Sequence, residues 1–296
     1  RAHACRAYSP DDTRHGRWKE VTSSDILPTM GDTQTGETLL TESQRMDLLR
    51  RFDAERRDLL PGHALRVQEG GVVRHVDRFG TSSDIVFSSH TEAQFDAAVQ
   101  QEIAYFEHRG HDFEWKAYAH DPPGRLFERL RHLGFDIGTE EAVVVAPVGR
   151  VIEAEDPGHD VRSVTDESGL ADYMQVRVQV WPDTPAAYGE SLARQLRNDP
   201  SSLEMCVAYV DGLPVGSARN GFHPDSLFSG MAGGGVIRKY RHRGVYRSMV
   251  AHRARQAAAR NVPWLQVDAL PSSRPILEGL GFTAITTTRP CLWRTS

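Results

Sequence analysis

The stretch Gly234-Gly235-Val236-Ile237-Arg238-Lys239-Tyr240-Arg241-His242-Arg243-Gly244-Val245-Tyr246-Arg247-Ser248 decides the fold of this chain. It predicts a short apolar strand, a basic turn and the start of a helix, since apolar residues continue at helical spacing through Met249, Val250, Ala254, Ala257 and Ala258. A helix N-terminus has unpartnered backbone N–H groups and a partial positive charge, so it attracts anions. Gly244 lets a ligand approach the backbone, and Arg241, His242 and Arg243 add positive charge. The stretch therefore predicts a phosphate-binding turn.

The turn is not one of the common nucleotide-binding loops, because it contains neither G-x-x-x-x-G-K-[ST] nor G-x-G-x-x-G. Its residues 241–246, Arg-His-Arg-Gly-Val-Tyr, resemble the acyl-CoA signature [RQ]-x-x-G-x-[GA] of the GNAT acetyltransferase superfamily, with Tyr246 in place of the small last residue. The resemblance implies acetyl-CoA as cosubstrate, with its pantetheine arm inserted between two splayed strands. The residues that it assigns to acyl-CoA are Val236 and Ile237, through their backbone groups, and Arg241, His242, Arg243, Gly244, Val245, Tyr246 and Arg247.

The basic run has two alternative interpretations. A solvated surface loop is what basic runs usually are, and an arginine-rich nucleic-acid contact is the other alternative. The formal net charge of -5 and the lack of an aromatic platform beside the run argue against nucleic acid. The order strand, turn, helix favours acyl-CoA over both.

Composition limits the class of protein. A length of 296 residues suits one large domain or two of ordinary size. Cys5, Cys206 and Cys291 are far apart and form no C-x-x-C pair, so we expect reduced thiols in a cytoplasmic protein, with Cys206 a buried and inert one. No apolar run reaches the roughly 20 residues of a membrane helix, so we expect no membrane partner. His108 and His111 match no zinc signature, and we assign no metal.

The order of predicted elements indicates an α/β protein of two GNAT-like units with mixed sheets. Residues 1–40 are polar and form a predicted mobile tail, and one interpretation is that the part before Met30 is a processed or added leader. Residues 41–150 would be a degenerate GNAT-like unit and residues 151–296 the acetyltransferase unit. A loose internal repeat carries this division: strand, Pro-led helix and Gly-Phe recur around Gly134-Phe135 and Gly281-Phe282. "Leu-Gly-Phe" after a short helix also resembles the closing segment of GNAT domains.

Several boundaries are specific expectations. Asp121-Pro122 should cap a helix, and a strand over Ala142–Val148 should close the first unit. Gly149–Asp160 should be a linker, because it is charged and contains Pro157-Gly158. A pair of strands should fill Thr283–Trp293.

Acetylation of an amine needs a group that takes the amine proton and donors that stabilise the oxyanion. Glu204, in a central strand, and Asp268, at the end of a later one, are the candidate catalytic bases, although ordinary structural roles are commoner for such carboxylates. His223 is a third possibility. The resemblance implies a Tyr acid on the last helix, where this chain has Leu277, and an Asn that Ser272 or Ser273 replaces.

The function that the resemblance implies is acetyl-CoA-dependent N-acetyl transfer to a primary amine of a small molecule or peptide. The segment with Trp181, Pro185 and Tyr188 would cover the acceptor site, although hinge or packing roles fit it equally well. The acceptor, the acyl chain length and the choice between monomer and homodimer stay open. The alternative is a catalytically inactive CoA-binding regulatory or interaction module, which the missing Tyr favours.

Overall fold

The computed structural model describes residues 5–7, 19–21, 40–60, 64–77 and 83–295. Most of the predicted tail and its Met30 lie outside these residues. The described parts of the tail are two short strands, β1 (Cys5–Ala7) and β2 (Lys19–Val21), which pair with each other antiparallel. Within the described chain, no helix is both long and apolar enough to cross a bilayer.

The earlier part of the chain alternates strands with helices. Its elements are α2 (Glu42–Asp58), β3 (Ala64–Glu69), β4 (Val72–Asp77), β5 (Ser83–Ser88), α3 (Glu92–Glu107), β6 (Phe113–Tyr118), α4 (Leu126–His132), β7 (Asp136–Ile137) and β8 (Glu141–Pro147). Local chemistry explains several of these boundaries. Thr41 and Gln44 form a capping box at the start of α2, and Gly70 and Gly71 make the β3–β4 turn at positive φ.

The later part continues the alternation. Its elements are α5 (Val148–Glu153), β9 (Asp160–Ser163), α6 (Glu167–Val180), α7 (Ala187–Asn198), β10 (Leu203–Val210), β11 (Leu213–Gly221), β12 (Phe228–Val236), the 3-10 turn η1 (Arg238–Tyr240), α8 (Val245–Ala259), β13 (Trp264–Ala269), α9 (Arg274–Glu278) and β14 (Thr283–Trp293). Asp211 and Gly212 make the β10–β11 turn with positive φ, as their sequence predicts.

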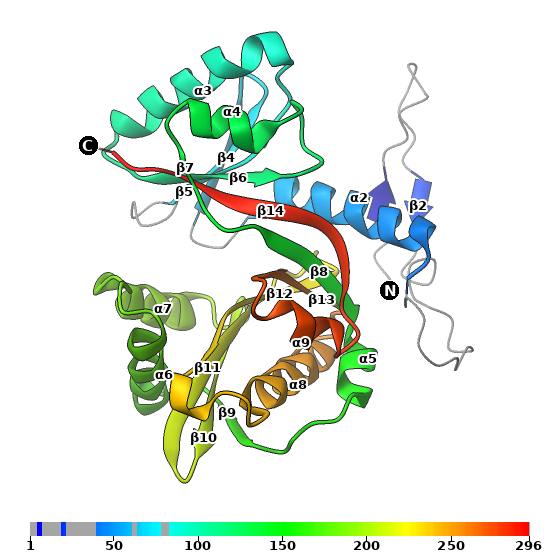
Figure 1. Cartoon of the computed structure of the whole chain (residues 1–296), viewed down its shortest axis with the longest axis vertical. Helices are drawn as coiled ribbons and strands as arrows, with labels where there is room; N and C mark the ends of the chain where they lie inside the picture. Colours follow the sequence, from blue (N-terminus) through cyan, green and yellow to red (C-terminus); the bar gives the residue numbers. More distant parts are fainter. Residues whose placement is uncertain (1–4, 8–18, 22–39, 61–63, 78–82, 296) are drawn as a thin grey trace.

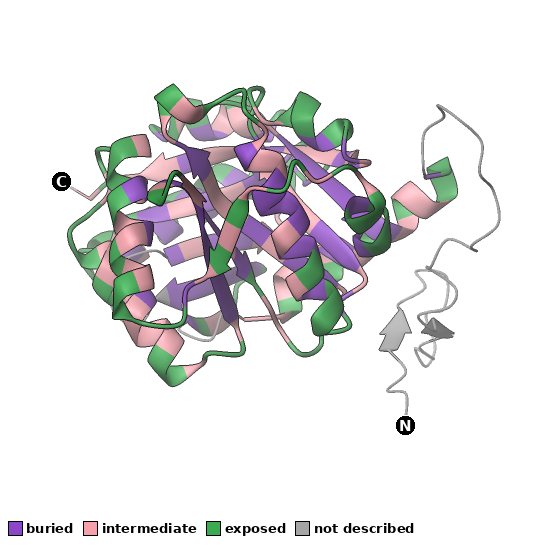
Figure 2. Ribbon diagram, turned by 90° about the horizontal axis from the view of Figure 1, so that it is seen from below, coloured by how far each residue is buried: buried purple, intermediate pink, exposed green. Residues whose placement is uncertain are grey.

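A single mixed sheet joins the two parts. In the described residues it has 12 strands, in the order β3-β4-β5-β6-β14-β8-β13-β12-β11-β10-β9, with β7 also paired to β14. Figure 1 shows β14 running from the half that contains α8 and α9 to the half that contains α3 and α4. In Figure 2 buried strands occupy the centre, and the helices outside them are partly exposed.

The two halves exchange strands. β13, of the later part, pairs antiparallel with β8, and β6, of the earlier part, pairs antiparallel with β14. The predicted strand over Ala142–Val148 therefore exists, but it inserts between β14 and β13 instead of only closing the first unit. The division into residues 41–150 and 151–296 stays a prediction, and the pairing shows that each part of the chain completes the other's sheet.

Three local expectations were wrong. Asp121 does not cap a helix: α4 begins four residues later than its Pro122, at Leu126, and the Asp121 carboxylate binds Arg56. Residues 149–153 of the predicted linker belong to α5, because Val148 and Val151 of that helix pack in the core against α8. Thr283–Trp293 is one long strand, since it has pairing partners along its whole length in β8, β6 and β7.

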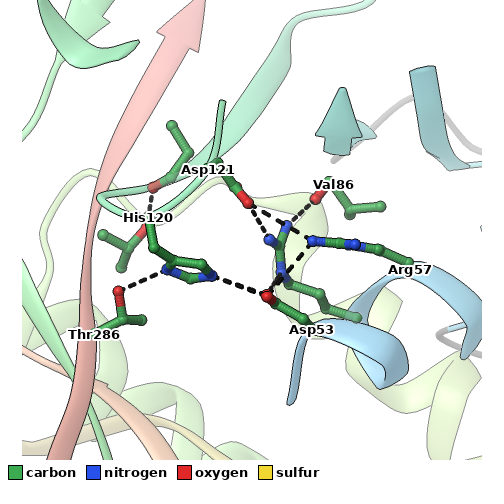
Figure 3. A network of polar contacts seen from close by, with 9 residues as sticks. Asp53, Arg57, Val86, His120, Asp121 and Thr286 are labelled. Carbon is green, nitrogen blue, oxygen red and sulfur yellow. Dashed lines mark hydrogen bonds and ion pairs between the residues drawn. The ribbon is translucent and has the colours of Figure 1, made fainter. Parts of the chain in front are cut away.

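Helix α2 is held against the sheet by a buried polar network. Asp53 lies 3.0 Å from His120 Nε2, and the Nδ1 atom of His120 lies 2.8 Å from Thr286 of β14 (Figure 3). Arg56 of α2 binds both Asp53 and Asp121 and also donates to the carbonyl oxygen of Val86. The network thereby connects α2 to β5, to the loop after β6 and to β14.

The helices of the later part cover opposite faces of the sheet. Along β10, Cys206 and Ala208 pack with Met249 of α8, while the alternate residues Met205 and Val207 pack with Tyr173 of α6. Strand side chains alternate between faces, so α8 and α6 lie on the two sides of the same strands. This arrangement defines an α8 face and an α6 face at the candidate site.

Candidate acyl-CoA site

A split between two parallel strands is the centre of the candidate site. β12 and β13 pair only at Phe228–Trp264, Ser229–Leu265 and Gly230–Gln266. Beyond Gly230, β12 continues to Val236 and β13 to Ala269 without pairing with each other. An extended ligand that entered this split could form backbone hydrogen bonds as an added strand does.

A β-bulge in β12 lies directly after the start of the split. Arg219 of β11 is opposite Ala232 and Ser217 is opposite Gly235, so Gly233 and Gly234 together face one residue of β11. Gly233 has a φ of +57°, which suits glycine. A bulge leaves one residue outside the ladder, and its backbone groups are then available to another partner.

Opposite Gly234, on the α8 face, lies Tyr246. A Cβ at Gly234 would lie only 3.1 Å from the Tyr246 ring, so the aromatic side chain that departs from the small-residue signature fits because residue 234 is glycine. The guanidinium of Arg253, a residue 1% exposed, lies beside the same glycine, and its Nη2 atom has no hydrogen-bond partner.

The basic turn ends at an uncapped helix. Gly244 is the N-cap of α8 at φ +85°, and no side chain caps its first-turn N–H groups. His242 also has positive φ, at 62°, and Arg241 and Arg243 beside it are exposed. Val245 is buried below this end of the helix, while Arg247 is half-buried in the first turn. The geometry matches the predicted anion site, a helix N-terminus surrounded by cations.

The segment before β9 supports this turn from outside. Pro157 packs on Gly244, where a Cβ would lie 2.7 Å from Pro157 Cγ. The side chain of His159 hydrogen-bonds the carbonyl oxygen of Arg243 over 2.6 Å. Asp156 accepts from Ser248 of α8 over 2.7 Å and pairs with Arg255 over 3.1 Å. The turn is therefore held in one conformation, and Gly244 has neither the space nor the φ for another residue.

The backbone groups of Val236 and Ile237, the residues predicted to bind the pantetheine arm, point in different directions. Ile237 donates its N–H to the carbonyl oxygen of Val215 over 2.9 Å, so this group already has a partner in the protein, and the assignment of Ile237 to the pantetheine arm stays a prediction. Because backbone groups alternate along an antiparallel strand, those of Val236 point away from β11 and toward the split. The carbonyl oxygen of Val236 accepts from Arg241 Nε over 3.0 Å.

Glu204 lies on the α8 face of β10 and is 6% exposed. Its Oε1 atom is 3.1 Å from both Ser163 Oγ and His252 Nε2, while its Oε2 atom has no partner. The structure thus places Glu204 under α8, with its carboxylate directed to neighbouring side chains. Its assignment as a catalytic base stays a prediction.

Glu204 and Cys206 with His252 form one of two groups in the described residues that could hold a metal ion, with ligand atoms within 4.8 Å of one another. Burial, reinforced by the charge of Glu204, raises the pKa of the Cys206 thiol to about 12, which keeps it protonated and disfavours metal binding. In the second group the two carboxylates, Asp53 and Asp121, already bind Arg56. We assign a metal to neither group.

Asp268 lies at the end of β13 in a second charged cluster. Its Oδ2 atom is 2.8 Å from Lys116 Nζ of β6, and its Oδ1 atom accepts from Gln266 over 2.9 Å. Burial alone would lower the pKa of Lys116, but Asp268 and neighbouring groups outweigh it and hold that pKa well above its usual value. The Asp268 carboxylate is therefore paired with a stable ammonium group, and its role as a base stays a prediction.

Glu141, at the start of β8, makes this cluster sensitive to pH. Burial raises its pKa to about 7, with Asp268 and Glu114 adding to the rise and Lys116 opposing it. An unfolded glutamate has a pKa of about 4.3, so between these two values the folded protein holds more protons than the unfolded one. The free energy of unfolding should therefore fall as pH rises through this window.

Glu141→Gln should remove that dependence. We expect the variant to lose less stability than wild type between about pH 4.5 and pH 7. Urea unfolding at several pH values measures this, with Glu153→Gln, an exposed residue in α5, as the control. If wild type and Glu141→Gln have parallel pH profiles, the carboxyl is ionised throughout and the assignment fails.

A cavity of about 360 Å³ lies where β12 and β13 begin to separate. Gly230 and Gln266, the last paired residues of the two strands, line it together with α2 and the loop after β11. Most of its other walls are apolar or aromatic, with contributions from Phe52, Phe222 and Phe228, and His223 is also at its edge. Glu55 of α2 lines it too and accepts from Leu227 N over 3.1 Å.

Sequence reasoning missed this cavity, because α2, β11 and β13 are far apart in the chain. Glu55 carried no signal either, since a carboxylate on an amphipathic helix is usually solvated. Leu277, where the resemblance implies a Tyr acid, is fully buried among apolar residues of the α8 face.

Comparison with known proteins identifies the fold. No protein-family model matches the sequence, and no curated protein matches it. Among solved structures, a GCN5-related N-acetyltransferase from Kribbella flavida matches with a TM-score of 0.62 at 15% identity, over 81% of this chain and 94% of its own. A functionally unknown conserved protein from Staphylococcus epidermidis matches with a TM-score of 0.60 at 16% identity, over 79% and 95%.

A tandem GNAT protein from the clavulanic acid biosynthesis pathway also matches, with a TM-score of 0.52 at 12% identity, over 81% of this chain and 86% of its own. The chain therefore has the mixed α/β fold of the GNAT acetyltransferases, and one of the matches is itself a tandem protein. The predicted fold class and the predicted resemblance are confirmed. At these identities the likeness establishes the fold, and the activity has to be argued from the site.

Proposed function

We propose that this protein is an acetyl-CoA-dependent N-acetyltransferase that acts on a primary amine. The observation that carries the proposal is the split between β12 and β13, which leads to the uncapped, arginine-flanked N-terminus of α8. The N-terminus of α8 would bind the pyrophosphate, and Val236 would bind the pantetheine arm in the split. The predicted cytoplasmic location and the absence of nucleic-acid, membrane and metal partners stay expectations.

The reaction follows from this placement. The amine nitrogen attacks the thioester carbonyl carbon, the C–N bond forms, the C–S bond breaks, and the amine proton is finally balanced by a proton on the CoA sulfur. The bulge at Gly233–Gly234 supplies backbone groups that are outside the sheet ladder, and an N–H there could stabilise the oxyanion. The cavity at Gly230 and Gln266 is the route by which the acceptor would reach the thioester.

Calorimetric titration with acetyl-CoA and with free CoA tests the donor assignment. Arg243→Gln should weaken both affinities by roughly tenfold, because it removes a charge beside the phosphates. Arg260→Gln is the matched control: it removes the same charge at the other end of α8, about 20 Å away, and should change neither affinity. Equal effects of the two variants would show a nonspecific charge effect, and no binding by wild type would remove the proposal.

The alternative is a CoA-binding regulatory or interaction module without catalysis. Leu277 favours it, because the side chain that would protonate the leaving thiolate is absent, and both predicted bases already have partners. Amine-dependent release of the CoA thiol separates the two functions. Tight CoA binding with no release for any class of amine would favour the module.

A further inference from the structure

A second group of polar side chains faces the β12 bulge from the α6 face. We call it the donor cluster: Tyr173 and Arg177 of α6, Tyr188 of α7 and Arg219 of β11. Its members converge on Gly233. A Cβ at Gly233 would lie 3.3 Å from Arg177 Nη1, 3.5 Å from Tyr173 Oη and 3.8 Å from Arg219 Nε. The cluster therefore borders the split where the thioester is proposed to lie.

Several donors in this cluster have no acceptor outside it among the described residues. Tyr173 is 0% exposed, and its hydroxyl interacts with the hydroxyl of Tyr188, but neither hydroxyl bonds any other acceptor in the described residues. The Nε atom of Arg219 is also buried and has no hydrogen-bond partner. Unpartnered buried polar atoms cost free energy and are rare in folded proteins. The Tyr173 hydroxyl and Arg219 Nε both lie beside Gly233, which indicates that a ligand supplies the acceptor atoms.

The cluster is positively charged and contains no carboxylate. Across the described residues, neither Arg177 nor Arg219 forms an ion pair with an Asp or Glu side chain. The guanidinium of Arg177 stacks on Trp181 and Tyr188, 4.1 and 4.8 Å from their ring centroids, and its Nε atom donates to Thr184 over 3.3 Å. Stacking orients the planar guanidinium while its other N–H groups stay able to bind a ligand.

We infer that the donor cluster binds an anionic group of the acceptor, so that the substrate is a primary amine that also carries a carboxylate or a phosphate. This inference rests on the proposed function and narrows it. Guanidinium groups and hydroxyls that only donate match the acceptor oxygens of such anions. An amino sugar with several ammonium groups would be repelled by the same charges.

The position of the donor cluster also agrees with the proposed route of the acceptor through the cavity. Gly230 lines the cavity and Gly233 contacts the donor cluster, and both lie on β12 beside the split. An amine held by its anionic group at Gly233 would thus have its nitrogen close to the thioester. Proximity of this kind contributes much of the rate acceleration in two-substrate reactions.

Matched substrates test the inference on the full-length protein with acetyl-CoA. The pairs are an amino acid with its carboxamide, and phosphoethanolamine with ethanolamine, and an amino sugar is tested beside them. The anionic member of at least one pair should have a kcat/KM at least about tenfold higher, since charge-assisted hydrogen bonds would be lost with the neutral member. Whichever pair shows the difference identifies the anion.

Variants separate a ligand-binding role from a structural one. Tyr173→Phe should raise the KM for the anionic amine and leave CoA affinity unchanged, while Tm changes little because the buried hydroxyl that is removed contacts only the Tyr188 hydroxyl. Arg219→Met should lower kcat/KM for the anionic amine by about tenfold to a hundredfold. The ratio of kcat/KM between the anionic and the neutral amine should therefore decrease. Arg162→Met is the control. Arg162 of β9 lies over the ring of Tyr209, as Arg219 lies over that of Tyr188, but it is exposed and pairs with Asp160.

The outcomes distinguish a failure of the proposed function from a failure of the proposed anion site. Absence of acetyl-CoA binding overturns the proposed function. Acetyl-CoA binding with a preference for neutral or polycationic amines overturns only the anion site. If no amine is turned over, calorimetry of the CoA complex with the amino acid and with phosphoethanolamine decides, and the anion site is overturned if neither binds.

Discussion

Gly244→Asp should abolish measurable binding of CoA and acetyl-CoA. The substitution places a carboxylate at the N-cap of α8, where the pyrophosphate is proposed to lie. Two like charges about 4 Å apart repel by about 4 kcal/mol at an effective dielectric constant of about 20, which corresponds to roughly a thousandfold in affinity. Isothermal titration of the folded variant measures the loss.

The structure shows that charge is not the whole effect. A Cβ at residue 244 would lie 2.7 Å from Pro157 Cγ, and the backbone there has a φ of +85°. Gly244→Ala carries the steric and conformational strain without the charge, and it is the necessary control. We expect the alanine variant to lose affinity and Tm to a smaller extent and to bind CoA still. If Gly244→Asp remains folded and binds CoA as wild type does, the phosphate site has been placed wrongly.

Arg56→Met should lower the free energy of unfolding by about 3–5 kcal/mol, the range found when one partner of a buried ion pair is removed. Arg56 bridges Asp53 and Asp121, and its side chain and that of Asp121 are 7% and 6% exposed. Its guanidinium also lies 4.3 Å from the ring centroid of Tyr118. The substitution leaves two carboxylates close together, with only the more exposed Arg57 and His120 near them.

The destabilisation should also depend on pH. Burial raises the pKa of Asp121 even with Arg56 beside it, and removing that cation raises it further. An acid whose pKa is higher in the folded than in the unfolded state loses folding stability as pH rises, so the effect should be larger at pH 8 than at pH 5. Urea unfolding measures both values.

Arg50→Met provides the comparison for this experiment. Arg50 is on the same helix and pairs with Asp47, but the two side chains are 68% and 44% exposed. A pair of this kind contributes at most about 1 kcal/mol. If Arg56→Met lowers the free energy of unfolding no more than Arg50→Met does, the network does not anchor α2. The position of α2 beside the cavity must then depend on other contacts.

The sequence predicted the strand, turn and helix of the candidate acyl-CoA site closely, because each depends on neighbouring residues. Apolar periodicity indicated α8, and Gly244 indicated the turn that starts it. Where a distant partner decided the local structure, prediction failed: Asp121 binds Arg56 of α2 instead of capping a helix.

The candidate catalytic bases were difficult to predict from the sequence for a different reason. Glu204 and Asp268 were chosen by strand position, but a strand pattern does not say which group will meet the side chain across the fold. The structure gives Glu204 a partner on α8 and Asp268 a partner on β6. The prediction that Cys206 is buried is confirmed, because an apolar strand environment suffices to bury its side chain.

The sequence by itself thus determined the fold class and the strand, turn and helix of the proposed phosphate site, since periodicity, glycine positions and local charge specify short segments. Only the tertiary structure decided the strand exchange between the two halves, the cavity against α2 and the donor cluster at Gly233. These features bring together residues that are tens to more than a hundred positions apart, as when Phe52 and Gln266 line one cavity. Long-range packing creates such sites, because burial and unpartnered hydrogen-bond donors are properties of the assembled sheet and its helices.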